Sequence, residues 1–346
     1  MALANSRVLW RAATQYLVLA ALAGCVPAMT QAHEPGHDQA APVPVVEGHC
    51  AAVTRSIVEA GFGDVVSVSC KDGQALIASN TYPDHPMMTG IVGTNEQVPV
   101  PAENYVSPIP LEPVLGHEPH TRDAALGVAV NGVPIYDYTG GGEMSVADLS
   151  VHQARNDTVL TQQLDICGGH AGRGDDYHYH ATPTCMIAQM PNAGPAAILG
   201  WAFDGFPIYG DTNPDGSAIA PGDLDVCNGQ RDPVYGFRYH TSKGAPYIIQ
   251  CLRGQTAAMA DLPRVPPLRP SGRDGGSGLS SGTPPRGGVE NLVFTQDESG
   301  LRSMTYSYQG AAYFINYTPS ATAGCYDFET RRVTDGGAVF SGELCR

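Results

Sequence analysis

Two imidazoles stand two positions apart in the run Tyr177-His178-Tyr179-His180. Because side chains at positions i and i+2 of a β-strand share a face, His178 and His180 can turn toward one ion while the tyrosines face the other way. His170 precedes this run in a glycine-rich stretch that we expect to form a turn. Three neutral imidazoles suit zinc or copper and leave an open position for water. These residues therefore predict a transition-metal site built from His170, His178 and His180.

Further polar residues are available to complete this site. Asp165, Asp176, Asp204, His85 and His240 are candidate ligands, or groups that hold a ligand ring through its second nitrogen. Of these, we expect His85 and Asp204 to join the three histidines as ligands. Asp175 and Asp176 are neighbours whose side chains point apart in an extended segment, so we also expect this pair to lie in a solvated turn.

The sequence leaves open what the site does, and whether the protein is an enzyme. A bound metal can turn a water ligand into a hydroxide nucleophile, which would make the protein a metal-dependent hydrolase of cell-surface material. A second alternative is a non-enzymatic module for extracellular glycans or proteins, in which Tyr177, Tyr179 and Trp201 line an open groove. In a third, the histidines form hydrogen bonds inside a polar β core and hold no metal.

Two other motif matches do not fit their context. His33-Glu34-Pro35-Gly36-His37 spells the zinc-protease pattern, but that pattern needs a helix, which Pro35 and Gly36 prevent. Residues 278–282 spell a nucleophile elbow, but they lie in a Gly/Ser-rich stretch without a strand before it. We therefore interpret neither match as an active site.

The residues around the histidines belong to an internal repeat. Residues 127–136 match 200–209 at an offset of 200 − 127 = 73, while 165–170 match 225–230 and 177–180 match 237–240 at an offset of 225 − 165 = 60. The offset falls by 73 − 60 = 13, which predicts a longer connection in the first copy, around residues 140–157. We expect two similar β units that pack face to face.

The two copies differ at the histidines. The corresponding pairs are His170 and Gln230, His178 and Arg238, and His180 and His240. Cysteine, glycine and tyrosine positions persist in both copies, as scaffold positions should. Because the histidines are concentrated in the first copy, we predict one metal site rather than two.

The ordered motifs of the chain also carry a family resemblance. They are Ser79-Asn80, Pro83-Asp84-His85, Asn131-Gly132-Val133-Pro134-Ile135, Cys167-Gly168-Gly169-His170, Tyr177-His178-Tyr179-His180 and Asp204-Gly205-Phe206-Pro207-Ile208-Tyr209-Gly210. Over residues 75–255 the chain resembles the YHYH domain proteins, an exported bacterial family named after the Tyr-His-Tyr-His run. The resemblance implies an extracytoplasmic domain and points to His85, His170, His178 and His180, but it implies neither a reaction nor a metal.

The elements that must position these residues are mostly strands. Glycine (41 residues) and proline (28 residues) are frequent, which indicates a turn-rich, mainly β protein. Of the nine cysteines, setting Cys25 aside leaves an even 9 − 1 = 8, as expected in an oxidising compartment. Many pairings are possible, and we expect the sequential one because each pair brackets a compact segment: Cys50 with Cys70, Cys167 with Cys185, Cys227 with Cys251, and Cys325 with Cys345.

The chain divides into segments of different composition. Residues 49–79 are expected to form a disulfide-closed helix-hairpin, with Val53, Ile57 and Val58 on the buried face of the helix and strands at 65–69 and 75–79. The duplicated domain follows at 80–255, then a Pro/Gly/Ser-rich linker at 256–290 and a C-terminal β segment, or cap, at 291–346, with strands at 303–308 and 312–318.

The start of the chain predicts export. Arg7 and Arg11 precede a short apolar run, so residues 1–24 read as a signal peptide and residues 25–48 as a flexible tether. Leu22-Ala23-Gly24-Cys25 is similar to a lipobox, which predicts a lipid anchor at Cys25; ordinary cleavage after Ala32 is the alternative. We expect a periplasmic or cell-surface lipoprotein, or otherwise a secreted protein.

The net charge of the chain limits the kinds of partner that it can bind. The formal net charge is −15, and Lys71 and Lys243 are the only lysines. Without a basic patch to neutralise phosphates, the sequence excludes nucleic acid as a partner. A metal ion and a cell-surface glycan or protein are the partners that we expect.

Overall fold

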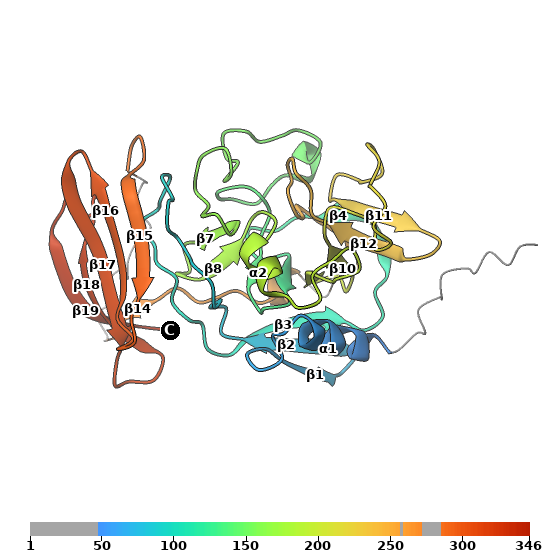
Figure 1. The fold of residues 1–346 in the computed structure, drawn as a ribbon, viewed down its shortest axis with the longest axis horizontal. Coiled ribbons are helices and arrows are strands. Elements are labelled where there is room, and N and C mark those ends of the chain that lie inside the picture. Colours follow the sequence, from blue (N-terminus) through green and yellow to red (C-terminus); the bar gives the residue numbers. More distant parts are fainter. Residues whose placement is uncertain (1–47, 257–258, 272–284) are drawn as a thin grey trace, which may run out of the picture. The chain divides into compact units, whose positions relative to one another are not determined.

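The computed structural model describes residues 48–256, 259–271 and 285–346. Over these residues the chain forms four β-sheets and short helices, which confirms the predicted mainly β class (Figure 1). No helix in this part of the chain is long and apolar enough to cross a membrane. The predicted signal peptide, Cys25, residues 25–47 of the tether and both rejected motifs lie outside the described residues.

The N-terminal segment contains the predicted helix and hairpin. Helix α1 (His49–Glu59) precedes the antiparallel strands β1 (Ser67–Lys71) and β2 (Gln74–Ser79). A disulfide joins Cys50 of the helix to Cys70 of β1. Strand β3 (Tyr105–Pro110) pairs with β2, so this sheet also takes in residues from beyond position 80.

The buried face of α1 differs from the prediction at one residue. Val53 and Ile57 are buried, but Val58 is 59% exposed, so its assignment to the core is wrong. At the helical spacing, Ser56 shares the face of Val53 instead. Its hydroxyl donates to the Val53 carbonyl (2.8 Å) and accepts from the indole nitrogen of Trp201 (3.0 Å), which makes a serine acceptable in the core.

A single eight-stranded sheet contains both copies of the repeat. Its strands are β5 (Gly127–Ala129), β6 (Pro134–Ile135), β7 (Gly169–Ala171), β8 (Tyr177–Tyr179), β9 (Gly200–Ala202), β10 (Pro207–Tyr209), β11 (Gly229–Asp232) and β12 (Gly236–His240). They follow the order β11-β12-β10-β9-β5-β6-β8-β7, so β9 and β5 meet at the centre and each copy extends outward from them. The predicted face-to-face packing is therefore wrong: the copies join edge to edge.

The pairing of β5 with β9 at the centre of the sheet places equivalent residues of the two copies in equivalent positions. Val128 lies opposite Trp201, and the equivalent residues Gly127 and Gly200 flank that pair on the two strands. A Cβ on Gly127 would lie 2.6 Å from the Trp201 carbonyl oxygen, and one on Gly200 would lie 2.7 Å from the Val128 carbonyl oxygen. Glycine at these equivalent positions therefore permits the junction.

The connection after the first strand pair is longer in the first copy, as predicted. Thr139 bridges to Asp157 in the first copy, and Thr212 bridges to Ala218 in the second. The bridged residues are separated by 157 − 139 = 18 and 218 − 212 = 6 positions in the sequence, a difference of 12 against the 13 expected from the alignment. The extra residues include the 3₁₀ turn η1 (Val146–Asp148).

All four predicted disulfides are present, in the sequential pairing. Cys167–Cys185 and Cys227–Cys251 occupy matching places in the two copies. Helix α2 (Thr184–Gln189) carries Cys185, and a small sheet pairs β4 (Leu115–His120) with β13 (Leu252–Gly254). Each of the two bonds thus fixes the chain just outside the outer strands of its copy.

The C-terminal segment forms a six-stranded antiparallel sheet. It contains β14 (Arg269–Pro270), β15 (Glu290–Gln296), β16 (Arg302–Tyr308), β17 (Ala311–Pro319), β18 (Cys325–Arg331) and β19 (Val339–Cys345), after the 3₁₀ turn η2 (Met259–Asp261). The buried Glu96 accepts from the backbone of Val333 (2.7 Å) and Thr334 (3.0 Å) and from the hydroxyl of Tyr306. One buried carboxylate thereby attaches this sheet to the residues that precede the duplicated domain's central sheet.

Candidate metal centre

The structure brings His170, His178 and His180 together at one outer end of the central sheet. His170 lies in β7 directly opposite His178 in β8, and His180 follows β8 immediately. The expectation of a turn at His170 is wrong, because the turn-forming residues lie on either side of it: Gly168 has a φ of +86° and Asp175 a φ of +51°. Cross-strand pairing therefore adds the third imidazole to the His-x-His pair.

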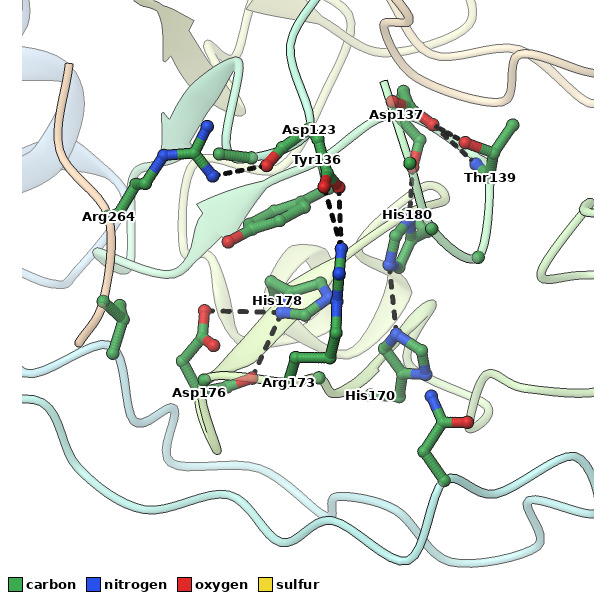
Figure 2. A pocket seen from close by; sticks show the side chains of 18 of the residues that line it. Asp123, Tyr136, Asp137, Thr139, His170, Arg173, Asp176, His178, His180 and Arg264 are labelled. Atoms are coloured by element: carbon green, nitrogen blue, oxygen red, sulfur yellow. Dashed lines mark hydrogen bonds and ion pairs between the residues drawn. The ribbon is translucent and has the colours of Figure 1, made fainter. Parts of the chain in front are cut away.

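The three rings form a compact triangle in the interior (Figure 2). Their centroids lie 5.0, 4.8 and 4.8 Å apart, and each histidine is at most 7% exposed. One nitrogen from each ring lies within 4.8 Å of the others, and Nε2 of His170 is 3.1 Å from Nε2 of His180. Two nitrogens bound to one tetrahedral zinc would be about 3.3 Å apart. The group can therefore hold a metal ion.

Each of the three histidines has a backbone acceptor outside the triangle. His180 Nδ1 donates to the carbonyl oxygen of Asp137, and His178 Nδ1 lies 3.1 Å from the carbonyl oxygen of Asp176 and 3.4 Å from its carboxylate. His170 makes a hydrogen bond to the backbone of Gln163 that acts to raise its pKa. Since a neutral imidazole has one N–H and one lone pair, the contacts of His178 and His180 leave the lone pairs of these two rings on Nε2.

The Nε2 atoms of His170 and His180, 3.1 Å apart, can share the proton of one neutral ring, or can bind one metal ion when both present lone pairs. An imidazolium is disfavoured here. Burial, and then the charges of its histidine neighbours, keep the pKa of His170 well below its ordinary value. The same causes lower the pKa of His180 to about 3, despite the hydrogen bond to Asp137. His170 and His180 are therefore neutral imidazoles, the form in which histidine binds a metal ion.

Asp175 and Asp176 are each 2% exposed, so the predicted solvated turn is wrong. Arg346 covers this pair, donating to the carbonyl oxygens of Gly174 (2.6 Å) and Asp175 (2.7 Å). Burial acts to raise the pKa of Asp176, but His178 and the charge of Arg346 outweigh it and hold the pKa below its ordinary value. Asp176 is thus an ionised group that can orient His178, while burial raises the pKa of Asp175 to about 7.

His85 and Asp204, the two further expected ligands, lie apart from this triangle. His85 Nε2 is 2.7 Å from the hydroxyl of Tyr179, a side chain on the opposite face of β8. Asp204 is fully buried in the second copy, where its carboxylate accepts from the hydroxyl of Tyr239 and from the backbone of Gly254 (2.8 Å). The structure therefore assembles three of the five expected residues into one group.

Asp165 and His240, the remaining candidate ligands, also make contacts away from the three histidines. Asp165 accepts from the backbone of Cys167 (2.9 Å) and from the hydroxyl of Tyr177 (2.9 Å), on the face away from the histidines. His240 belongs to the second copy, where its Nδ1 lies 2.8 Å from the carbonyl oxygen of Gly210. This contact matches the one between His180 and Asp137, because 210 − 137 = 73.

The second copy uses the corresponding positions differently. Arg238, 1% exposed, stands where the first copy has His178. Its guanidinium pairs with Asp232 and donates to the side-chain oxygens of Asn213 (2.8 Å) and Gln230 (2.9 Å). This end of the sheet therefore contains a permanent cation of its own, with acceptors around it.

A cavity of about 310 Å³ opens beside the three histidines. Tyr136 lines it and stacks on His178 at a centroid distance of 4.0 Å. Gly172 approaches His178 so closely that a Cβ there would lie 2.4 Å from the ring. Small and flat neighbours thus let a buried imidazole reach a cavity from which a fourth ligand can enter.

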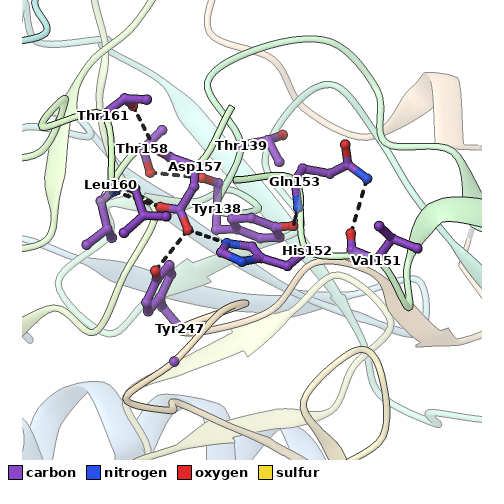
Figure 3. Close-up of polar contacts among 12 residues, drawn as sticks. Tyr138, Thr139, Val151, His152, Gln153, Asp157, Thr158, Leu160, Thr161 and Tyr247 are labelled. Carbon is purple, nitrogen blue, oxygen red and sulfur yellow. Dashed lines mark hydrogen bonds and ion pairs between the residues drawn. The ribbon is translucent and has the colours of Figure 1, made fainter. Parts of the chain in front are cut away.

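The long connection of the first copy forms part of the cavity wall at residues 139–142. The fully buried Asp157 anchors this connection: its Oδ2 accepts from His152 (2.7 Å) and Tyr247 (2.9 Å), and its Oδ1 accepts from the backbone of Val159 (2.8 Å) and Leu160 (3.0 Å) (Figure 3). Sequence reasoning found the extra length but missed this anchor, since Tyr247 lies far along the chain.

Comparison with known proteins agrees with the motifs. A family model described as YHYH protein matches residues 107–220, which confirms the family resemblance over that stretch. The chain shows no significant match to a curated protein or to a solved structure. The matched residues include all three clustered histidines, whereas Gln230, Arg238 and His240 lie beyond them.

Proposed function

We propose that this protein, whose residues 107–220 form a YHYH domain, binds one transition-metal ion through the Nε2 atoms of His170, His178 and His180. The convergence of three imidazoles on one buried point carries the proposal. A set of histidines that served only the polar core would place a donor against each acceptor, because unpaired buried polar atoms are costly. Here the Nε2 atoms of His170 and His180 lie 3.1 Å apart, and a nitrogen of His178 lies within 4.8 Å of a nitrogen of each, so all three imidazoles converge on one buried point.

Zinc or copper fits this donor set best. Both accept neutral imidazole nitrogens, and three such ligands leave a fourth position for water or another small molecule. The carbonyl and carboxylate groups behind the rings favour the tautomer that binds metal, and partners of this kind raise the affinity of a ligand for its ion. Asp176 adds one negative charge behind His178, which partly offsets the charge of a divalent ion.

The site disfavours both alternative functions, for different reasons. A groove for glycans would need exposed aromatic rings, yet Tyr177, Tyr179 and Trp201 are at most 2% exposed. The cavity gives a small molecule access to the ion but is at the small end of ligand-binding pockets, which disfavours a polymer of the cell surface as the substrate. Metal binding is therefore proposed without a hydrolytic reaction.

We further propose that the protein acts outside the cytoplasm. Four disulfides are consistent with an oxidising compartment. Export by the signal peptide and attachment through an acylated Cys25 remain proposals from the sequence. Mass spectrometry of the membrane fraction would separate an acylated Cys25 from a chain that begins after Ala32.

The test of metal binding is elemental analysis of protein purified without a histidine tag after growth with zinc and copper. We expect about one ion per chain, and loss of that ion in a His178→Ala/His180→Ala variant. Two control variants remove equal numbers of imidazoles elsewhere. They are His117→Ala/His120→Ala, at exposed positions in β4, and His33→Ala/His37→Ala, in the tether.

Both controls are expected to keep their metal. If wild-type protein holds no near-stoichiometric zinc or copper, the proposed function is wrong. If the tether variant rather than the His178→Ala/His180→Ala variant loses the ion, the metal site lies in the tether instead.

A further inference from the structure

The cavity beside the three histidines has a basic side. Arg173 and Arg264 both line it, and Figure 2 shows Arg264 on the other side of Tyr136 from His178. The lining also contains three aspartates, Asp123, Asp137 and Asp176, so the partners of each charged group decide what the cavity offers to a ligand.

The acidic side chains at this cavity already have partners. Both carboxylate oxygens of Asp123 accept from Arg173, each at 2.9 Å. Asp137 accepts from the backbone (2.7 Å) and hydroxyl (2.5 Å) of Thr139, and Asp176 contacts His178. The acids therefore do not fill the cavity with competing acceptors.

Arg264 is in a different position from Arg173. One of its terminal nitrogens donates to the carbonyl oxygen of Asp123 (2.6 Å), and among the described residues it has no carboxylate partner. A guanidinium offers five N–H groups in a planar fork, which matches the two oxygens of a carboxylate or phosphate. Arg264 thus has donors available for an anion.

Tyr136 adds a neutral donor between Arg264 and the histidines. Its ring stacks on His178 at an interplanar angle of 22° and lines the same cavity. A phenol keeps its proton at neutral pH, so Tyr136 offers an O–H donor. The cavity therefore combines a cationic fork, a phenol O–H and, when metal is bound, an open coordination position.

We propose that this cavity binds a small molecule with an oxyanion group, a carboxylate or a phosphate, which Arg264 holds against the ion at His170, His178 and His180. This inference rests on the proposed metal function. A cavity of about 310 Å³ is at the small end of ligand-binding pockets, which suits a small molecule. The anion would supply the fourth ligand, and Arg264 would determine which anions bind well.

The experiment uses the full protein loaded with cobalt(II), whose visible spectrum responds to a change in the fourth ligand. Sodium acetate and inorganic phosphate are titrated separately at constant ionic strength, with chloride as the reference anion. We expect one of the two to change the spectrum with saturation. Tighter binding of acetate identifies a carboxylate ligand, and tighter binding of phosphate identifies a phosphate ligand.

Arg264→Gln tests the role of the guanidinium. Glutamine keeps a donor for the Asp123 carbonyl but removes the charge, so the dissociation constant for the anion should rise about tenfold or more. Arg231→Gln, at an exposed position in β11, is the matched control and should bind as the wild type does. Cobalt content should be equal in all three proteins.

Two results would overturn the inference while leaving metal binding intact. One is cobalt-loaded protein whose spectrum no anion changes, and the other is an equal dissociation constant in wild type and Arg264→Gln. If no cobalt binds, the proposed function itself fails, and calorimetric titration of the metal-free protein decides about the anion. A heat of anion binding that is present in the wild type and absent in Arg264→Gln would then support an anion site. The absence of any heat in the wild type would contradict it.

Discussion

The two outer ends of the central sheet share the same scaffold but carry different residues at equivalent buried positions. At the first end, the imidazoles of His170, His178 and His180 converge on a common point. At the second, Gln230 and Arg238 replace two of these residues, and the guanidinium donates to the acceptors around it. One end has an internal cation, and the other has three histidines that could hold an external one.

The surrounding contacts explain why this exchange is possible. The tyrosine on the opposite face bonds to the turn residue of its own copy, Tyr179 to Asn131 and Tyr239 to Asp204. In each copy, the aspartate before the cysteine accepts from the following backbone N–H groups, Asp165 in the first and Asp225 in the second. The fold thus depends on one face of each strand pair, which leaves the other face free to change.

The strongest test of this comparison transfers the residues of the second copy to the first. In His170→Gln/His178→Arg, the new guanidinium should occupy the place of the ion, with Asp176 as its carboxylate partner. We expect the metal content to fall from about one equivalent to near zero, because one imidazole cannot retain the ion. Elemental analysis measures the loss, and near-ultraviolet circular dichroism checks that the fold remains. The control variant His240→Gln should keep its metal. If His170→Gln/His178→Arg also kept its metal, the two ends of the sheet would not be equivalent.

Removal of the internal cation should destabilise the second end. Arg238→Met leaves Asp232 and the amide oxygens of Gln230 and Asn213 without their donor. The free energy of unfolding should fall by about 3 kcal/mol, at the lower end of the range for a broken buried pair because Asp232 is 26% exposed. Urea denaturation measures it. The exposed Arg231→Met should change stability by less than about 0.5 kcal/mol, and equal effects would refute a special role for Arg238.

Asp175 at the first end and Asp232 at the second should make the free energy of unfolding depend on pH in opposite directions. Asp175 has its pKa raised to about 7 by burial, above its value in the unfolded chain. The native state therefore binds a proton more tightly, and stability falls as the pH rises from about 4 to about 7. Asp175→Asn should remove this dependence, on the order of 4 kcal/mol, in urea denaturation at pH 4 and pH 8. Asparagine also tolerates the left-handed backbone at this position, φ +51°.

Asp232 provides the opposite case. Burial acts to raise its pKa, but backbone N–H groups and Arg238 outweigh it and hold the pKa below its ordinary value. Its contribution to stability is therefore present above the pKa of the unfolded chain and is lost as the pH falls. Asp232→Asn should be less stable than wild type at pH 8 and nearly equal to it at acid pH. The same pH dependence in both variants would contradict this contrast.

The smallest expected effect concerns the orientation of a ligand. Asp176 holds His178, and the second copy has Gly236 at that position. Asp176→Asn should weaken metal binding about tenfold, or ~1.4 kcal/mol, because it removes the charge behind the ring while the backbone acceptor remains. Competition with a chelator of known affinity measures this loss. Asp123→Asn at the same cavity should stay within about twofold of wild type; if it weakens binding equally, a general charge effect explains the loss.

Much of the fold could be predicted from the sequence because its determinants are local or repeated. The repeat identified the equivalent strands, and the spacing of cysteines indicated all four disulfides. The arrangement of the two copies could not be read in this way. Strand pairing across the centre depends on the close approach of Gly127 and Gly200, which share an alignment column but carry no signal of what they contact.

The candidate site was predicted only in part for a similar reason. The period of a strand placed His178 and His180 on one face, but it could not show that His85 lies beside Tyr179 on the other. The burial of Asp175 and Asp176 depends on Arg346, which is distant in sequence. Arg264 enters the cavity from a proline-rich stretch whose composition predicts only a linker.

The sequence by itself determined the mainly β class, the duplication, the disulfide pairs and the concentration of histidines in one copy. Tertiary structure alone decided that His170 pairs across from His178, and that the acceptors at Asp137 and Asp176 direct the lone pairs of His180 and His178 inward. The physical reason is that the tautomer of a buried imidazole is determined by its hydrogen-bond partner, and those partners come from segments that only folding brings together.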